Sequence, residues 1–230
     1  MRIDARRVPA LLGLLFLLAF CVTTAVGTLA DALPAPVGVA ACFAGDTVKL
    51  ADRRIVRLAA ITTPKPAHGS AREQFYAKEA LRELDSLTRG HKVRFMPIGV
   101  KTRDRHGRIA GDLIRDDGQS LSELMVRRGA AIYSPDKNLL PQLQKRLQTL
   151  QCEAISEQAG FWKKLLESPL SARNYVGDKD SQRFFLADSP QAFNIKPRNR
   201  IYFGTVMDAF MAGFAPHATY PFWPDAVSMR

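Results

Sequence analysis

The sequence predicts an α+β fold built on a five-stranded β-barrel of the OB type, with three helices and a C-terminal extension. The chain of 230 residues contains several short strand-like runs, and runs with helical spacing separate them. Strands this short leave exposed edges in an open sheet, so closure into a barrel covered by helices is expected. The predicted order is three strands, a helix, two strands, a short helix, a short strand and a long helix, which fits a Greek-key barrel.

The first strands are predicted from alternation and from β-branched residues. Val48 and Leu50 alternate with polar residues, and residues 55–61 are rich in branched side chains, as strands are. Residues 51–54 are the candidate turn between these runs. Gly45-Asp46 interrupts the first run, as a bulge or tight bend would.

A helix is predicted after a proline-rich loop. Ser70 and Glu73 have the spacing of a capping box, and apolar residues at intervals of three and four follow as far as Gly90, where the helix should end. Residues 93–98 and 109–114 are predicted to be the next two strands.

Two further helices and one strand complete the predicted barrel domain. Ser120 and Glu123 form a second capping box, so a short helix is expected before the short strand at 130–133. Asn138 is expected to cap the third helix, whose first turn tolerates Pro141. The apolar stripe of that helix consists of Leu143, Leu147, Leu150 and Ala154.

Residues 1–32 are predicted to be a signal peptide or an N-terminal anchor. Arginines precede an uncharged run over residues 8–30, and Ala30-Asp31-Ala32 offers a cleavage site with small flanking residues. The run is also nearly long enough to span a bilayer, so an uncleaved anchor stays open. Either interpretation makes the protein secreted or periplasmic, with membrane contact only through this segment.

The rest of the chain is divided into a barrel domain at 33–164 and an extension at 165–230. Polar residues 168–182 are predicted to be a linker, and residues 201–206 a strand. Aromatic residues are frequent between 184 and 223. Because so many aromatics in water would favour aggregation, they are expected to pack as a small subdomain, with a partner-binding surface as the alternative.

The charge and the cysteines each leave two interpretations open. The formal net charge is +11, which favours a polyanionic partner such as nucleic acid or anionic lipid but also suits a generally soluble basic protein. Cys42 and Cys152 remain after signal cleavage. They are either one disulfide, as an oxidising compartment permits, or two buried free thiols.

Several short motifs appear in a fixed order. Gly45-Asp46-Thr47 lies at the first bend, and Val56-Arg57-Leu58 runs into Ile61-Thr62-Thr63-Pro64-Lys65. Arg103-Asp104-Arg105-His106-Gly107-Arg108 follows, and then Leu124-Met125-Val126-Arg127-Arg128-Gly129-Ala130-Ala131. Together these motifs, over roughly residues 40–164, resemble the staphylococcal nuclease (thermonuclease) family.

The resemblance implies a phosphodiesterase mechanism on DNA or RNA. In that family two arginines bind the scissile phosphate, which here would be Arg57 and Arg108. A guanidinium matches two phosphate oxygens at once, which supports this assignment independently. The family's calcium ion would be held by Asp46 and by the carbonyl of Thr63. No small-molecule cofactor is implied.

The acidic half of the family's site is mostly replaced in this sequence. Ala44 and Thr62 stand where the family has aspartates, and Lys65 stands in place of the glutamate that activates water. Calcium requires 6–8 oxygen ligands, usually with carboxylates among them, and a charged lysine cannot accept a proton. Calcium-assisted hydrolysis is therefore expected to be badly impaired.

Two functional interpretations follow, and they differ in turnover. In the first, Lys65 joins the arginines in a cationic phosphate site, with His68 as the candidate base of a metal-independent reaction. In the second, the domain binds nucleic acid, preferably single-stranded, without cleaving it. Arg105 is a further candidate for substrate contact through its charge. Tyr133 could stack on a base, and packing in the core is the equal alternative for this residue.

A third hypothesis belongs to a different class of protein. The chain could be a non-catalytic interaction module of the cell envelope, using the barrel and the aromatic extension to bind a partner.

Overall fold

The computed structural model describes residues 35–99, 102–104, 106–217 and 222–224. From Pro36 onward the chain forms one compact unit, and the predicted signal peptide or anchor lies outside the described residues. Among the helices that can be described, none combines the length and apolarity needed to cross a bilayer.

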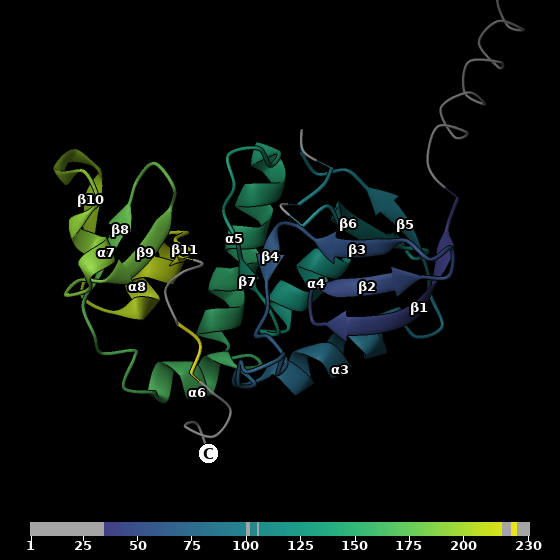
Figure 1. The fold of residues 1–230 in the computed structure, drawn as a ribbon, viewed down its shortest axis with the longest axis horizontal. Helices are drawn as coiled ribbons and strands as arrows, with labels where there is room; N and C mark the ends of the chain where they lie inside the picture. Colours follow the sequence, from purple (N-terminus) through teal and green to yellow (C-terminus); the bar gives the residue numbers. More distant parts are fainter. Residues whose placement is uncertain (1–34, 100–101, 105, 218–221, 225–230) are drawn as a thin grey trace, which may run out of the picture. The chain divides into compact units, whose positions relative to one another are not determined.

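The predicted barrel is confirmed. Its five strands close in the order β1-β2-β3-β6-β5, as Figure 1 shows in the purple to teal part of the ribbon. All neighbouring strands are antiparallel except β3 and β6, which pair in parallel. The strands are β1 (Val37–Ala44), β2 (Thr47–Leu50), β3 (Ile55–Leu58), β5 (Lys92–Met96) and β6 (Ile109–Arg115).

Two short strands form a separate small sheet beside the barrel. β4 (Ile61–Thr62) and β7 (Ile132–Tyr133) pair antiparallel, with Ile61 opposite Tyr133 and Thr62 opposite Ile132.

The barrel interior is filled by apolar side chains that are 0–1% exposed, among them Val48, Leu50, Val56, Leu58, Val93 and Leu113.

Three helices cover the barrel, as predicted, but two of them begin later than the sequence suggested. They are α3 (Ala77–Thr88), α4 (Leu121–Arg127) and α5 (Pro141–Ser156). Ser120 caps α4, because its side chain accepts a hydrogen bond from the Glu123 N–H. Asn138 does not cap α5; Leu140 holds that position and Pro141 is the first helical residue.

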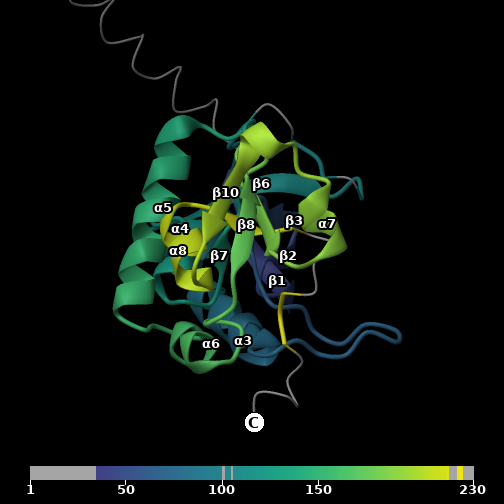
Figure 2. The same cartoon turned by 90° about the vertical axis from the view of Figure 1, so that its left-hand side faces the viewer.

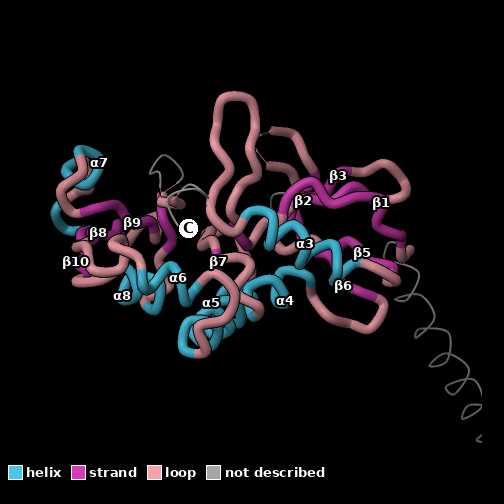
Figure 3. The backbone as a smooth tube through the Cα atoms, turned by 90° about the horizontal axis from the view of Figure 1, so that it is seen from below, coloured by secondary structure: helices cyan, strands magenta, loops and turns pink. Residues whose placement is uncertain are grey.

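The predicted capping box at Ser70 and Glu73 is wrong. The segment between β4 and α3 forms a projecting loop instead, visible in Figures 2 and 3. Its base is closed by hydrogen bonds between Lys65 and Gln74, and His68 and Ala71 form an isolated bridge near its tip. These cross-loop bonds satisfy backbone groups that a helix would otherwise use, so α3 starts only after Tyr76.

The extension is a small subdomain that packs against the barrel's last helices. Its sheet has the order β10-β8-β9-β11 (Figure 1). The predicted linker is wrong in part, because β8 lies within it. α6 (Trp162–Glu167) spans the predicted boundary. The elements after it are β8 (Tyr175–Asp178), β9 (Arg183–Leu186), α7 (Pro190–Phe193), η1 (Pro197–Asn199), β10 (Arg200–Phe203), α8 (Val206–Met211) and β11 (Ala215–Pro216).

Most aromatic residues of the extension are buried, as expected. Trp162 is 0% exposed and packs against Phe210, which in turn contacts Phe184 and Phe222. This cluster also includes Ile132, Ala154 and Phe161 from the preceding domain. Residue 164, the predicted boundary, therefore falls inside α6 and within a core shared by both segments. Phe193 and Tyr202 remain exposed, at 68% and 70%.

Candidate phosphate-binding site

The β1–β2 turn places a single carboxylate at the end of the barrel. A Cβ on Gly45 would lie 2.9 Å from the Cβ of Ala80 and 3.1 Å from that of Thr63, so only glycine permits this approach. The turn therefore packs directly against the segment that follows β4. Asp46, the next residue, is 1% exposed.

Asp46 contacts two cationic side chains. Its Oδ2 lies 2.5 Å from Lys65 Nζ and 3.6 Å from Arg57 Nε. Its Oδ1 accepts a hydrogen bond from Thr47 Oγ1 at 2.9 Å. The carboxylate is thus fully engaged, and it holds both cations at the same corner of the barrel.

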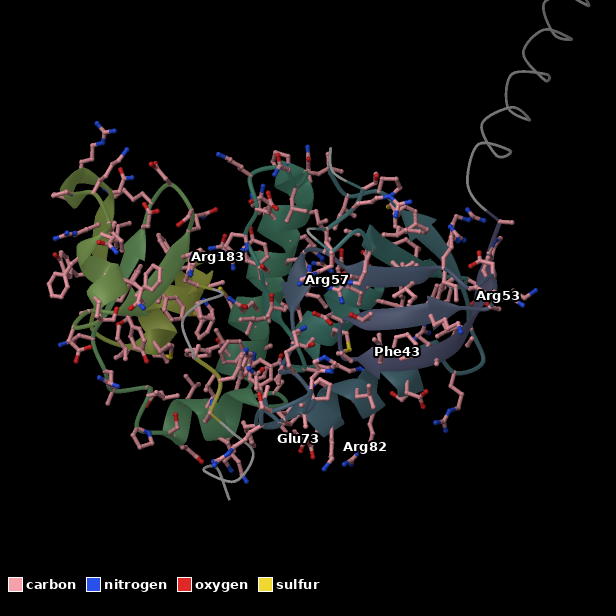
Figure 4. All side chains as sticks on the ribbon, viewed as in Figure 1. Phe43, Arg53, Arg57, Glu73, Arg82 and Arg183 are labelled. Atoms are coloured by element: carbon pink, nitrogen blue, oxygen red, sulfur yellow. The ribbon has the colours of Figure 1, made fainter. Side chains whose placement is uncertain are left out.

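Arg57 is fixed by the register of β3. It lies opposite Thr47 on β2 and Ala110 on β6, and its Nη2 donates to the Ile61 carbonyl at 3.4 Å. Its side chain is 22% exposed. The guanidinium is therefore held by the strands and still reaches solvent (Figure 4).

Arg108 is presented by a tight turn just before β6. Asp104 accepts from the Arg108 N–H and side chain, with Nη2 at 2.8 Å, and also from the His106 N–H. Partial burial raises the pKa of Asp104, but the hydrogen bonds from Arg108 and His106 outweigh it and hold that pKa below its usual value. The side chain of Arg108 remains 35% exposed.

Lys65 lies within reach of both arginine charges. Its pKa is lowered, first by burial and then by the charges of Arg57 and Arg108, while Asp46 acts in the opposite direction. Arg57 is paired with Ala110, two residues after Arg108. The structure therefore places Arg57 and Lys65 on Asp46, with the charge of Arg108 acting on Lys65. Their role as phosphate-binding residues stays a prediction.

The remaining candidate residues differ in burial and in distance from Asp46. Tyr133 is 2% exposed, and its hydroxyl donates to Gln144 Oε1 at 3.0 Å. This burial agrees with the core-packing alternative for Tyr133 and leaves no ring face open for stacking. Thr63 is fully buried and lies beside Gly45. His68 lies exposed near the tip of the projecting loop, and Arg105 lies outside the described residues.

Cys42 and Cys152 are both free thiols, which agrees with the second of the two alternatives left open by the sequence. Cys42 Sγ lies 3.8 Å from Thr88 Oγ1, between β1 and α3. Cys152 Sγ lies 3.9 Å from the Met211 carbonyl, between α5 and α8. The two side chains pack into different interfaces, which the sequence separation could not reveal.

Comparison with known proteins identifies the family to which the barrel belongs. The family model of staphylococcal nuclease homologues matches residues 55–164. An uncharacterized endonuclease of Escherichia coli is 32% identical over 119 residues, which cover 51% of this chain and 71% of that relative. The chain belongs to the staphylococcal nuclease homologue family.

More distant relatives of the family also match. Endonuclease YhcR of Bacillus subtilis is 25% identical over 162 residues, covering 64% of this chain and 12% of that relative. A probable endonuclease of Komagataella phaffii is 31% identical over 120 residues, which cover 50% of this chain and 51% of that relative. The family match includes Arg57, Lys65 and Arg108 and begins after Asp46.

The calcium ion implied by the staphylococcal nuclease family does not fit the residues present. Of the acidic positions that the resemblance implies around calcium and its water, Asp46 alone carries a carboxylate in this sequence, and the Lys65 ammonium lies on its Oδ2 at 2.5 Å. A divalent cation there would meet a fixed positive charge and only one anionic ligand, where calcium needs 6–8 oxygens. The Lys65 ammonium therefore occupies the position beside Asp46 that the calcium ion would need.

A second group with metal-ligand geometry lies elsewhere on the barrel. His91, Asp116 and Asp117 each offer a ligand atom within 4.8 Å of the others. This group flanks the start of β5 and the end of β6, whereas Arg108 precedes β6. The seven residues of β6 span about 23 Å at roughly 3.3 Å per residue, so the group is remote from the phosphate-binding residues.

One charged residue near the site was not predicted from the sequence. Arg183, on β9 of the extension, donates from Nη2 to Ser134 Oγ at 3.0 Å and to the Pro135 carbonyl at 2.7 Å. It belongs to no motif, and the family match ends at residue 164. Only the packing of the extension against the barrel domain reveals it.

Proposed function

We propose that this protein binds the phosphodiester backbone of nucleic acid, preferably a single strand, with weak or absent hydrolysis. The observation that carries the proposal is the 2.5 Å contact between Lys65 Nζ and Asp46 Oδ2, beside Arg57 and Arg108. Three cations against two carboxylates, Asp46 and Asp104, leave a local excess of positive charge. A phosphate oxygen cluster is the ligand that matches it.

Binding is supported by the preorganisation of the cationic groups. Arg57 is fixed by strand register and Arg108 by the turn at Asp104, so few side-chain rotamers are lost when a phosphate arrives. Planar guanidiniums offer paired donors to phosphate oxygens. The overall charge of +11 would add a non-specific, salt-sensitive attraction to the same polyanion.

Weak turnover is inferred from the lack of a proton acceptor at the position of the family's glutamate. Lys65 stands at that position, and its ammonium is already donating to Asp46. Asp46 is 1% exposed and holds two cations, so it is poorly placed to activate water. A site that holds phosphate in the ground state without a base retains affinity and loses rate.

The test measures binding and cleavage on the same purified protein. A fluorescein-labelled single-stranded oligonucleotide reports affinity by anisotropy, and gel analysis reports cleavage with calcium or with a chelator. Arg57→Ala should weaken binding on the order of ten-fold, as loss of a charge-assisted phosphate contact would. Arg82→Ala is the matched control, because Arg82 on α3 is 70% exposed and pairs only with Glu79 among its described neighbours.

The outcomes separate the two parts of the proposal. Equal affinity of the wild type and Arg57→Ala would end the assignment of the site. Rapid calcium-dependent cleavage by the wild type, abolished in Arg57→Ala, would keep the site and refute the loss of turnover.

We also propose that the protein is exported. The support is the sequence pattern of residues 1–32 alone. Fractionation of cells that express the full chain, with sequencing of its N-terminus, tests this. Recovery of uncleaved protein in the cytoplasm would contradict export, and uncleaved protein in the membrane fraction would favour the anchor.

A further inference from the structure

The extension brings a guanidinium to the segment that follows β7. Arg183 Nη2 donates to both Ser134 Oγ and the Pro135 carbonyl. Ser134 in turn donates its backbone N–H to the Ala60 carbonyl at 2.9 Å, directly before β4. β4 leads into Thr63 and Lys65. Arg183 is therefore tied to the same backbone that positions the phosphate-binding residues.

The charge of Arg183 lies close to that of Arg57. The pKa of Arg183 is lowered by burial first, then raised by Asp136 and Tyr133, and lowered again by the like charge of Arg57. Figure 4 shows Arg183 on the side of the extension that faces the barrel, with Arg57 on the barrel itself. Two guanidiniums from separate parts of the chain thus share one electrostatic environment.

Arg183 has no direct counter-ion in the part of the chain that the structure describes. Its hydrogen bonds to described residues both leave from Nη2 toward neutral oxygens, and no described carboxylate lies within the 4.0 Å of an ion pair. Placing like charges near one another in a half-buried position costs free energy. An anionic ligand between them would offset that cost.

We propose that Arg183 is a substrate-binding residue contributed by the extension, which donates to a phosphate next to the one held by Arg57 and Arg108. Nη2 is braced by Ser134 and Pro135, and among the described residues the other donors of the planar guanidinium stay available for the ligand. The extension is then part of the nucleic-acid site and lengthens the path of the bound strand. This inference rests on the proposed function.

The experiment compares Arg183→Gln with Arg198→Gln on a fluorescein-labelled single-stranded oligonucleotide. Both variants remove one positive charge from the extension, but Arg198 lies exposed on η1. Arg183→Gln should weaken binding on the order of ten-fold and reduce the salt slope by about 0.7, as loss of one phosphate contact to a single strand would. Arg198→Gln should stay within about two-fold of the wild type.

Ser134→Ala tests whether Arg183 acts only by bracing the loop. It removes one acceptor and leaves the charge, so the salt slope should stay at the wild-type value. An equal loss of slope in Ser134→Ala and Arg183→Gln would overturn direct contact. If Arg183→Gln fails to fold, Arg183→Lys is the deciding variant. If the guanidinium fork contacts the phosphate, Arg183→Lys should keep the wild-type salt slope and lose several-fold in affinity. Wild-type affinity of Arg183→Lys would refute the contact through the guanidinium.

The failure of this inference is distinguishable from failure of the proposed function. Wild-type protein that binds no oligonucleotide overturns both. Wild-type binding that depends on Arg57, with unchanged affinity and slope in Arg183→Gln, overturns the role of Arg183 alone.

Discussion

Lys65 Nζ lies 2.5 Å from Asp46 Oδ2, and these residues come from different elements, a loop after β4 and the turn between β1 and β2. The pair occupies the position at which the resemblance to the family implies a calcium site. The ammonium of Lys65 lies where a divalent cation would need to bind. Unlike a metal ion, an ammonium has no open coordination position for water. Under the proposed function, phosphate binding survives this exchange because it needs only positive charge, whereas activation of water by a metal does not.

Restoring two acidic residues should restore calcium binding. In Lys65→Glu/Thr62→Asp, three carboxylates would surround the position of the ammonium, and their mutual repulsion would be relieved by calcium. Millimolar calcium is expected to raise the melting temperature of the double variant by about 2–4 °C for each kcal/mol of binding. Lys65→Glu alone is the control and should respond less. A double variant indifferent to calcium would place these positions outside any metal site.

Gly45→Ala should destabilise the protein and disturb the site. The added methyl group would lie 2.9 Å from Ala80 Cβ and 3.1 Å from Thr63 Cβ, and overpacking of this kind costs about 1–3 kcal/mol. Gly38→Ala is the matched control on β1, the strand that leads into this turn, because its nearest neighbour would be the Ala51 Cβ at 4.0 Å. Urea unfolding measures both. Equal stability of the two variants would contradict the close approach of the turn.

Asp112→Asn should destabilise the junction of β6 and α4. The buried carboxylate of Asp112 accepts hydrogen bonds from Ser120 Oγ, Ser122 Oγ, and the N–H groups of Leu113 and Ser122. The NH2 group of asparagine would face some of the groups that now donate to the carboxylate and could not accept from them. The expected loss in the free energy of unfolding is therefore roughly 3 kcal/mol. Asp188→Asn, at a site 74% exposed, should change stability little. A small loss at both positions would argue against this network.

The stability of the protein should fall in alkaline solution through Tyr133. Burial raises its pKa to about 12 from a usual value of 10.0, although the charge of Arg183 lowers it and Asp136 raises it. Between these two values the unfolded chain has released the proton and the folded chain has not, so stability is lost as pH rises from 10 toward 12. The loss should reach roughly 2–3 kcal/mol.

Tyr133→Phe isolates this effect. It removes the hydroxyl and its bond to Gln144 at 3.0 Å, which should cost about 1 kcal/mol below pH 9. Other titrating groups are shared by both proteins, so their stability difference should shrink and then reverse as pH increases. Parallel pH profiles from denaturant unfolding would contradict the raised pKa.

Local patterns predicted most of the elements because they depend on nearby residues. Alternation at Val48 and Leu50 predicted β2, and Ser120 predicted the start of α4. The same local rule failed at Ser70, since the bonds between Lys65 and Gln74 close a loop. Capping signals compete with cross-loop contacts that a linear pattern does not contain.

The sequence by itself determined the barrel class, the two arginines and the replacement of the acidic residues, because each depends on residue identity and order. The tertiary structure alone decided that Lys65 pairs with Asp46, that Tyr133 is buried, that the cysteines are separate, and that Arg183 approaches the site. These are contacts between segments distant in the chain. They depend on how closed strands and packed helices orient side chains in space, which periodicity and composition do not encode.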